Sequence, residues 1–323
     1  MCTQAALADT LRVATYAAPF SRDGPGLLLR DIGKGDDPQL VAALAVIEHI
    51  TPDVLLLTDF DYDYDAMALR AFAAALDYPY HFALRPNTGI RTGLDLDGNG
   101  RLGEARDAQG YGRFSGDGGM AIVSRYPIAE TDVVNMSTLL WKDLPGATLP
   151  TTMTPEVADV QRLSTSGHWI VPVETPIGLM SLMAYAATPP VFDGPEDYNG
   201  LRNRDELLMW ESKLDERPPA GFVVLGNANL DPLDGEGYSA AMAAFLARPI
   251  LQDPHSGQPT ANWPEDGPGD LRISYVLPAT SWKVKDAGVF WPASGDPFAE
   301  LLGNDGLAAG VHHLVWVDIS RDP

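Results

Sequence analysis

The chain has 323 residues, 45% of them hydrophobic, and its 44 Asp and Glu against 22 Lys and Arg give a net charge of −22. This balanced composition excludes collagen-like, disulfide-scaffold and disordered proteins. Nucleic acids are bound through Lys and Arg, so the charge disfavours a nucleic-acid partner, while a small anion bridged by a metal stays compatible with it. The single cysteine, Cys2, excludes an intramolecular disulfide. No apolar run reaches the roughly 18 residues of a membrane span, so we expect no membrane partner.

Residues 1–9 predict either the remnant of an export signal or a short leader. Ala6-Leu7-Ala8 has the small-x-small form of a signal-peptidase site, but the charged and apolar regions that precede such a site are missing. The first interpretation predicts a periplasmic or extracellular protein, and the second leaves the cytoplasm open. We expect residues 10–323 to form a single domain, because the first and last predicted strands both have the pattern of core strands.

Hydrophobic periodicity predicts short strands, most of them rich in Val, Ile and Leu, along the whole chain. In chain order they cover Leu11–Tyr16, Val54–Leu57, His81–Leu84, Met120–Ser124, Trp169–Val173, Leu179–Tyr185, Phe222–Gly226, Ile273–Leu277 and His313–Ile319. Helical patterns cover Leu40–Ile50, Asp65–Leu76, Arg204–Leu214 and Ser239–Leu246. Strands outnumber helices, and several follow one another without a helix between them. We therefore expect an α/β (α+β) fold, a four-layer sandwich with two mainly antiparallel sheets flanked by helices.

Polar residues follow several of these strands, at the points where buried strands meet loops and where enzymes commonly place chemistry. The stretches read LRVATYAAPF (11–20), PDVLLLTDFDYD (52–63), FVVLGNANLDP (222–232) and AAGVHHLVWVDI (308–319). In this order and spacing they resemble the endonuclease/exonuclease/phosphatase superfamily, the metal-dependent phosphohydrolases typified by pancreatic deoxyribonuclease and the abasic-site repair nucleases. Longer stretches resemble one bacterial branch of that superfamily: NTGIRTGLDLDGNGR (87–101), GGMAIVSRYPI (118–128), TPPVFDGPEDYNGLRNRDE (188–206) and LRISYVLP (271–278). The resemblance covers nearly the whole chain and implies a deoxyribonuclease-I-like fold.

The resemblance also implies a reaction centre. In the family, carboxylates hold Mg²⁺ or Mn²⁺, an Asp activates water, and a His held by another Asp neutralises charge on the transition state. Asn229 and His312 keep the family's residue. The other positions carry Ala17 for Asn, Asp59 for the metal-binding Glu, Ala186 for His, Asn227 for Asp, Ser274 for the Asp that orients the final His, and Val311 for Asp.

These substitutions remove chemistry that the reaction needs. Asn227 cannot take up a proton near neutral pH, and the apolar Val311 cannot ligate a hard cation. Asp59 is the residual metal ligand. We therefore expect a catalytically inactive pseudoenzyme with a binding role, whose partner is a small anion or a protein. The alternative is a weak or altered metal-dependent phosphodiester or phosphomonoester hydrolase that uses Asp59, Asn229 and His312.

Ordinary structural roles are open for the same residues. Asn229 can stabilise a turn through its own backbone. Asp59 can cap the helix predicted near Asp65, and His312 can be a polar residue at the start of a strand. Arg202 is expected to fix the local architecture by pairing with a nearby carboxylate.

A separate signal lies between the strands. Asp95, Asp97 and Asn99, followed by a glycine, match positions 1, 3, 5 and 6 of a calcium loop. Position 12 is an arginine and no flanking helices are evident, so the segment is not an EF-hand. The pattern predicts a structural Ca²⁺ site completed by Glu104 or Asp107, and the alternative is a plain turn.

Overall fold

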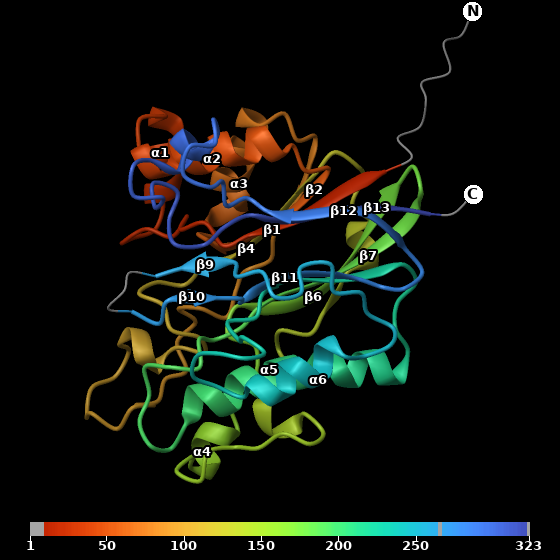
Figure 1. Cartoon of the computed structure of the whole chain (residues 1–323). Coiled ribbons are helices and arrows are strands. Elements are labelled where there is room, and N and C mark those ends of the chain that lie inside the picture. The colour runs from red at the N-terminus through yellow and green to blue at the C-terminus, as the bar shows by residue number, and fades with distance from the viewer. Residues whose placement is uncertain (1–9, 264–266, 322–323) are drawn as a thin grey trace, which may run out of the picture.

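Two sheets packed face to face form the centre of the protein in the computed structural model, which describes residues 10–263 and 267–321 (Figure 1). The first sheet has the strand order β12-β13-β1-β2-β4-β3. Within it β1 and β2 run parallel, and the other neighbours run antiparallel. Its strands are β1 (Leu11–Tyr16), β2 (Val54–Phe60), β3 (Tyr80–Phe82), β4 (Gly119–Ser124), β12 (Lys283–Val289) and β13 (Val315–Ser320).

The second sheet has the order β11-β8-β7-β6-β5, with β7 and β8 parallel and the other pairs antiparallel. Its strands are β5 (Val134–Asn135), β6 (Gly167–Thr175), β7 (Gly178–Ala186), β8 (Phe222–Asn227) and β11 (Ser274–Pro278). A short ribbon of β9 (Ala261–Asn262) and β10 (Asp270–Leu271) lies at one end of the two sheets. The expectation of two mainly antiparallel sheets is confirmed.

Helices cover the outer faces of the two sheets (Figure 1). On the first sheet lie α1 (Leu27–Lys34), α2 (Pro38–Ile50) and α3 (Met67–Ala75), and on the second lie α5 (Tyr198–Glu216) and α6 (Ser239–Leu246). The shorter helices are α4 (Pro155–Ala158) and the 3₁₀ turns Tyr64–Ala66, Ala105–Asp107, Glu130–Asp132, Trp141–Asp143 and Ala299–Leu302. The order helices, sheet, sheet, helices is the four-layer sandwich that the sequence predicts. None of the helices in the described part of the chain is long and apolar enough to cross a membrane.

The alternation of strand β1 shows how the layers are held together. Leu11 and Val13 are fully buried in the core between the two sheets. Ala14 and Tyr16 are buried in the core beneath the helices of the first sheet. Because successive side chains of a strand point to opposite faces, one strand supplies both cores.

Several predicted boundaries need correction. The predicted helix Asp65–Leu76 begins as α3 at Met67, because Asp65 and Ala66 have positive φ angles of 59° and 51°. Sequence patterns missed α1, whose N-cap is Gly26 without a capping side chain, and β12, none of whose residues is fully buried. The signal-like motif in residues 1–9 lies outside the described residues.

Candidate functional site

The candidate site lies where strands of both sheets end. In the first sheet β1 and β2 run parallel with Tyr16 beside Leu57, so Ala17 and Asp59 follow at the same end. In the second sheet Ala186 is the partner of Asn227, and Asn227 is the partner of Ser274. The register therefore places these three side-chain positions on adjacent strand ends.

Thr260 joins the two groups of strand ends. Its hydroxyl oxygen accepts the backbone N–H groups of Ile273 at 2.9 Å and Ser274 at 3.0 Å, in the second sheet. Its carbonyl accepts the N–H of His313, just before β13 of the first sheet, at 2.9 Å. The next residue, Ala261, forms a β-bridge with His312. Position 274 and the retained histidine therefore flank the same short segment.

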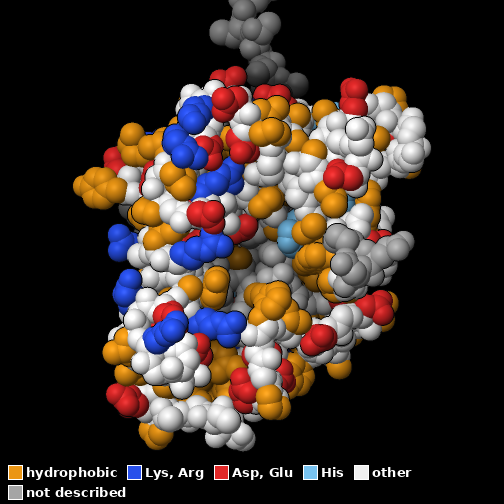
Figure 2. Space-filling model, turned by 90° about the vertical axis from the view of Figure 1, so that its left-hand side faces the viewer, with side chains coloured by type: hydrophobic (Ala, Val, Ile, Leu, Met, Phe, Trp, Pro, Cys, Tyr) orange, Lys and Arg blue, Asp and Glu red, His pale blue; other side chains and the backbone are white. Residues whose placement is uncertain are grey.

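Val311 contacts the same segment through its backbone. Its carbonyl accepts the N–H of Asn262 at 2.8 Å. Figure 2 shows the face onto which these strand ends open, with a hollow near its middle and Lys and Arg side chains gathered on one side. The structure thus brings the family positions of both sheets to one face of the molecule.

Asp59 holds the end of β2 in an unusual conformation. Its φ angle of 65° is left-handed, and its carbonyl accepts the N–H of Phe20 at 3.0 Å. The pKa of the Asp59 carboxyl is raised to about 7, chiefly by burial and also by the charges of Asp61 and Asp117, against a hydrogen bond from Ser21.

Neighbouring acidic residues have structural partners. Asp61 accepts the backbone N–H groups of Arg22 at 2.9 Å and Gly118 at 3.1 Å, which ties the loop after β1 to the start of β4. Asp63 accepts the N–H of Ala68 in the first turn of α3. The expectation that Asp59 caps this helix is therefore wrong, since Asp63 does so.

The retained Asn229 is engaged with the backbone. Its Nδ2 donates to the carbonyl of Ala187 at 2.8 Å, and its own N–H donates to Asn227 Oδ1 at 3.2 Å. Its φ angle of 50° is left-handed, a conformation that Asn tolerates better than most residues. In this arrangement Asn229 connects the ends of β7 and β8, and its amide nitrogen is already used.

His312 and Ser274 each have a buried polar atom that forms no hydrogen bond with the described part of the chain. The His312 Nδ1 and the Ser274 Oγ are buried and have no partner among the described residues. Burial, together with the neighbouring His313, lowers the pKa of His312 to about 4, so the imidazole is neutral at pH 7. The His312 ring contacts Trp263 in a T-shaped arrangement, with centroids 5.5 Å apart. The family would have an Asp at position 274 to orient this histidine.

The donor set of the cleft does not fit the divalent cation that the family implies. An ion site needs three or more carboxylate, His or Cys side chains close together. Within the described residues, the side chains that meet this condition are Asp95, Asp97 and Asp107. Those residues belong to the loop between β3 and β4. At the strand ends, Asp59 is the carboxylate that occupies a metal-binding position of the family. This one carboxylate is not enough, because a hard cation needs several oxygen ligands. We therefore derive no catalytic step through a metal in the cleft.

The Asp95 loop is organised around its carboxylates. Ligand oxygens of Asp95, Asp97 and Asp107 all lie within 4.8 Å of one another, and Asp107 is buried. Asn99 instead donates its amide to Asp97 at 3.0 Å and to Glu104 at 2.6 Å. Of the two residues expected to complete the site, Asp107 joins the group of three.

Arg202 in α5 is a buried structural residue. Its Nε donates to the carbonyl of Leu163 at 2.8 Å, and its Nη2 donates to the carbonyls of Gln109 at 2.6 Å and Ser164 at 3.2 Å. Its hydrogen-bond partners are backbone carbonyls, whereas the sequence favoured a carboxylate. These bonds fix the loops that approach the second sheet.

Sequence patterns missed a group of arginines in the loop between β3 and β4, Arg85, Arg91 and Arg113. They are exposed and line a cavity in the loop between β3 and β4. These arginines are spread along the loop without periodicity, so no sequence pattern predicts that they line one cavity. The sequence shows only that basic residues are rare in this acidic chain.

Two sheets closed by helices, with the strand ends of both opening onto one face, define a deoxyribonuclease-I-like fold. The profile of the Endonuclease/Exonuclease/phosphatase family matches residues 30–310, and the chain belongs to this family. No curated protein sequence matches the chain significantly.

Solved structures of the same family share the fold. An endonuclease/exonuclease/phosphatase from Beutenbergia cavernae is 19% identical, with a TM-score of 0.60 over 97% of this chain and 72% of the other. A protein of the same description from Bacteroides vulgatus is 12% identical, with a TM-score of 0.55 over 97% and 99% of the two chains. The catalytic domain of human Nocturnin is 14% identical, with a TM-score of 0.54 over 98% and 95%. At these identities the likeness concerns the fold.

Proposed function

We propose that this chain is a non-hydrolytic member of its family that serves as a binding protein. The observation that carries the proposal is that two buried atoms, His312 Nδ1 and Ser274 Oγ, have no hydrogen-bond partner among the described residues, at the position where a carboxylate would orient the histidine. A neutral histidine without an orienting partner does not stabilise charge on a transition state in the required geometry.

The remaining positions lower the expected activity further. Asn227 cannot act as a general base, and Ala17 and Ala186 offer no hydrogen-bonding group. Removing a single general base or charge-stabilising group costs about 10²–10⁴ in rate, and groups that act as a unit do not add. Losing several of them leaves essentially no catalysis.

The test is hydrolysis of bis(p-nitrophenyl) phosphate and p-nitrophenyl phosphate with Mg²⁺, Mn²⁺ or Ca²⁺. We expect rates equal to those of a blank purified in parallel, and the same rates for His312→Ala. A metal-dependent rate above the blank that His312→Ala abolishes would contradict the proposal and favour the weak hydrolase. The histidine variant is the matched control because it separates this cleft from a contaminating phosphatase.

We further propose that Asp95, Asp97 and Asp107 hold a structural Ca²⁺. Hard oxygen donors from three carboxylates, one of them buried, suit this ion. Since a ligand bound only by the native state stabilises it, EGTA is expected to lower the melting temperature by about 5 °C in a scan of the calcium-loaded protein. Asp97→Asn, at an exposed position, should remove the response to EGTA. Equal melting temperatures with excess Ca²⁺ and with EGTA would rule out the site.

A further inference from the structure

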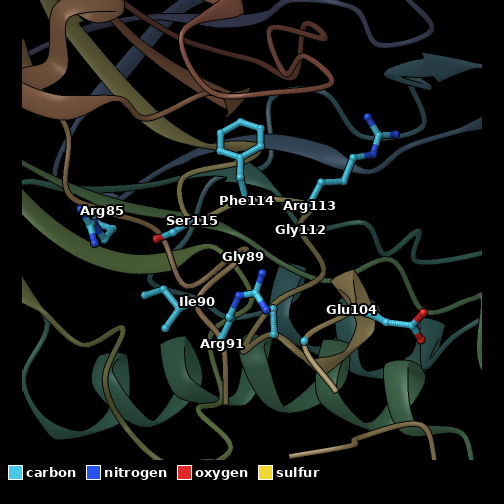
Figure 3. A pocket seen from close by; sticks show the side chains of 11 residues that line it. Arg85, Gly89, Ile90, Arg91, Glu104, Gly112, Arg113, Phe114 and Ser115 are labelled. Carbon is cyan, nitrogen blue, oxygen red and sulfur yellow. The ribbon is translucent and has the colours of Figure 1, made fainter. Parts of the chain in front are cut away.

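A cavity of about 370 Å³ lies within the long loop between β3 and β4, apart from the strand ends that carry the family positions (Figure 3). Its volume falls in the range of small-molecule sites, roughly 300–1,000 Å³. Among its lining residues are three arginines and one glutamate in a chain with a net charge of −22. A basic cavity in so acidic a protein is a local reversal of charge.

Two of the arginines are available to a ligand. Arg113 forms an ion pair with Asp23, and its side chain points away from Arg91 in Figure 3. Arg85 and Arg91 have no ion pair or side-chain hydrogen bond with any described residue. Figure 3 shows the Arg91 side chain rising toward Gly112, into the space between the loop segments.

The acidic residue of the lining does not neutralise them. Glu104 accepts hydrogen bonds from Asn99 at 2.6 Å and from Arg101 at 3.4 Å. Its side chain points away from Arg91 in Figure 3. Its charge is therefore satisfied on the outer side of the loop, and the guanidinium of Arg91 is left for an anion.

Glycines fix the shape of the cavity. A Cβ atom at Gly89 would collide with the carbonyl of Phe114, and one at Gly112 would collide with the backbone of Gly89. The Gly89 N–H donates to the Gly110 carbonyl at 3.0 Å, which holds the two strands of the loop together. A side chain at Gly103 would collide with the guanidinium of Arg91. The cavity is thus formed before a ligand arrives, which reduces the entropy cost of binding.

We propose that this cavity binds a small organic oxyanion, with the charged group on Arg91 and an apolar part against Ile90, while Arg85, beyond Ile90 in Figure 3, adds to the positive field of the cavity. Planar guanidinium groups suit phosphate and carboxylate oxygens, and the Ile90 side chain lies near Arg91 in Figure 3, whereas the Phe114 ring points away from both. The site uses no residue of the cleft and no metal, so it stands apart from the question of hydrolysis.

The test is titration calorimetry at low ionic strength on the calcium-loaded protein, without Mg²⁺, Mn²⁺ or chelator, with phenyl phosphate, benzoate, inorganic phosphate and phenol as probes. We expect phenyl phosphate or benzoate to bind with one-to-one stoichiometry, inorganic phosphate more weakly, and phenol not detectably. The stronger of the first two decides between a phosphate and a carboxylate ligand. Arg91→Ala should weaken binding about tenfold or more, because it removes a charge-assisted contact.

The matched control is Arg217→Ala, which removes an exposed arginine of the same charge at the end of α5. It should leave the affinity unchanged, and Arg85→Ala provides a second variant should Arg91→Ala fold poorly. Absence of binding by all charged probes at millimolar concentration overturns the inference, as does binding that neither arginine variant weakens or that phenol matches. Hydrolysis of phenyl phosphate on addition of Mg²⁺ would refute the proposed lack of catalysis without affecting this site.

Discussion

Replacing Gly226 by alanine is expected to lower the free energy of unfolding by more than about 4 kcal/mol or to prevent folding. Gly226 lies in β8 between β7 and β11, with Tyr185 and Tyr275 as its partners in register. Its φ angle is 138°, and a Cβ atom there would collide with the Tyr185 carbonyl. Strand β7 cannot move away, because it is buried and is hydrogen-bonded to β6 on its other side. Urea denaturation followed by circular dichroism measures the loss.

Gly33→Ala is the matched control for this variant. Gly33 lies in α1, its φ is not positive, and no atom lies within 4 Å of the position that a Cβ atom would take. Alanine at an unobstructed helical position is expected to raise the free energy of unfolding by about 0.5–1 kcal/mol. If Gly226→Ala were as stable as the wild type to within about 1 kcal/mol, the close approach of β7 and β8 described above would be wrong.

The sequence predicted the layers because the layers depend on local patterns. Runs such as Val54–Leu57 and Phe222–Gly226 are apolar throughout, and each is a buried strand in the structure. The 3.6-residue pattern of Leu40–Ile50 likewise falls within α2, whose cap Asp37 accepts the N–H of Leu40 at 2.8 Å. The residues of each of these elements are therefore enough to predict both its type and its burial.

What the sequence missed depends on contacts between distant residues. Thr260 unites the ends of the two sheets through three hydrogen bonds, but nothing near it in the sequence marks it. Strand β12 pairs with β13 although it contains Lys283, Lys285 and Asp286, because an edge strand with an exposed face tolerates charges. No local pattern reports such pairing.

The candidate site shows the same division. The resemblance identified which residues occupy the family positions, and the structure reveals how they are used. That Asn229 bonds the Ala187 carbonyl, and that His312 Nδ1 has no partner among the described residues, follows only from the three-dimensional arrangement. The sequence likewise shows that the chain is acidic, but only the structure shows what the carboxylates near the cleft do. Asp61 accepts the backbone N–H of Arg22, and the pKa of the buried Asp59 is raised.

Restoring the family residues is expected to create Mg²⁺-dependent phosphodiesterase activity at least about 100-fold above that of the wild-type protein. The variant combines Ala17→Asn, Asp59→Glu, Ala186→His, Asn227→Asp, Ser274→Asp and Val311→Asp. The physical reason is that the strand ends already converge, so carboxylates on them concentrate a cation at one place. The carboxylate at position 274 also supplies a partner for the buried His312 Nδ1, which raises the pKa of that histidine from about 4.

Two measurements make this result decisive. Isothermal titration should detect Mg²⁺ binding to the restored protein and none to the cleft of the wild type, and hydrolysis should follow the bound metal. Adding His312→Ala to the restored protein should return the rate to the wild-type level, because the histidine then no longer stabilises the transition state. A restored protein that folds and binds Mg²⁺ but stays inactive would show that the loss of these side chains is not enough to explain the proposed lack of catalysis.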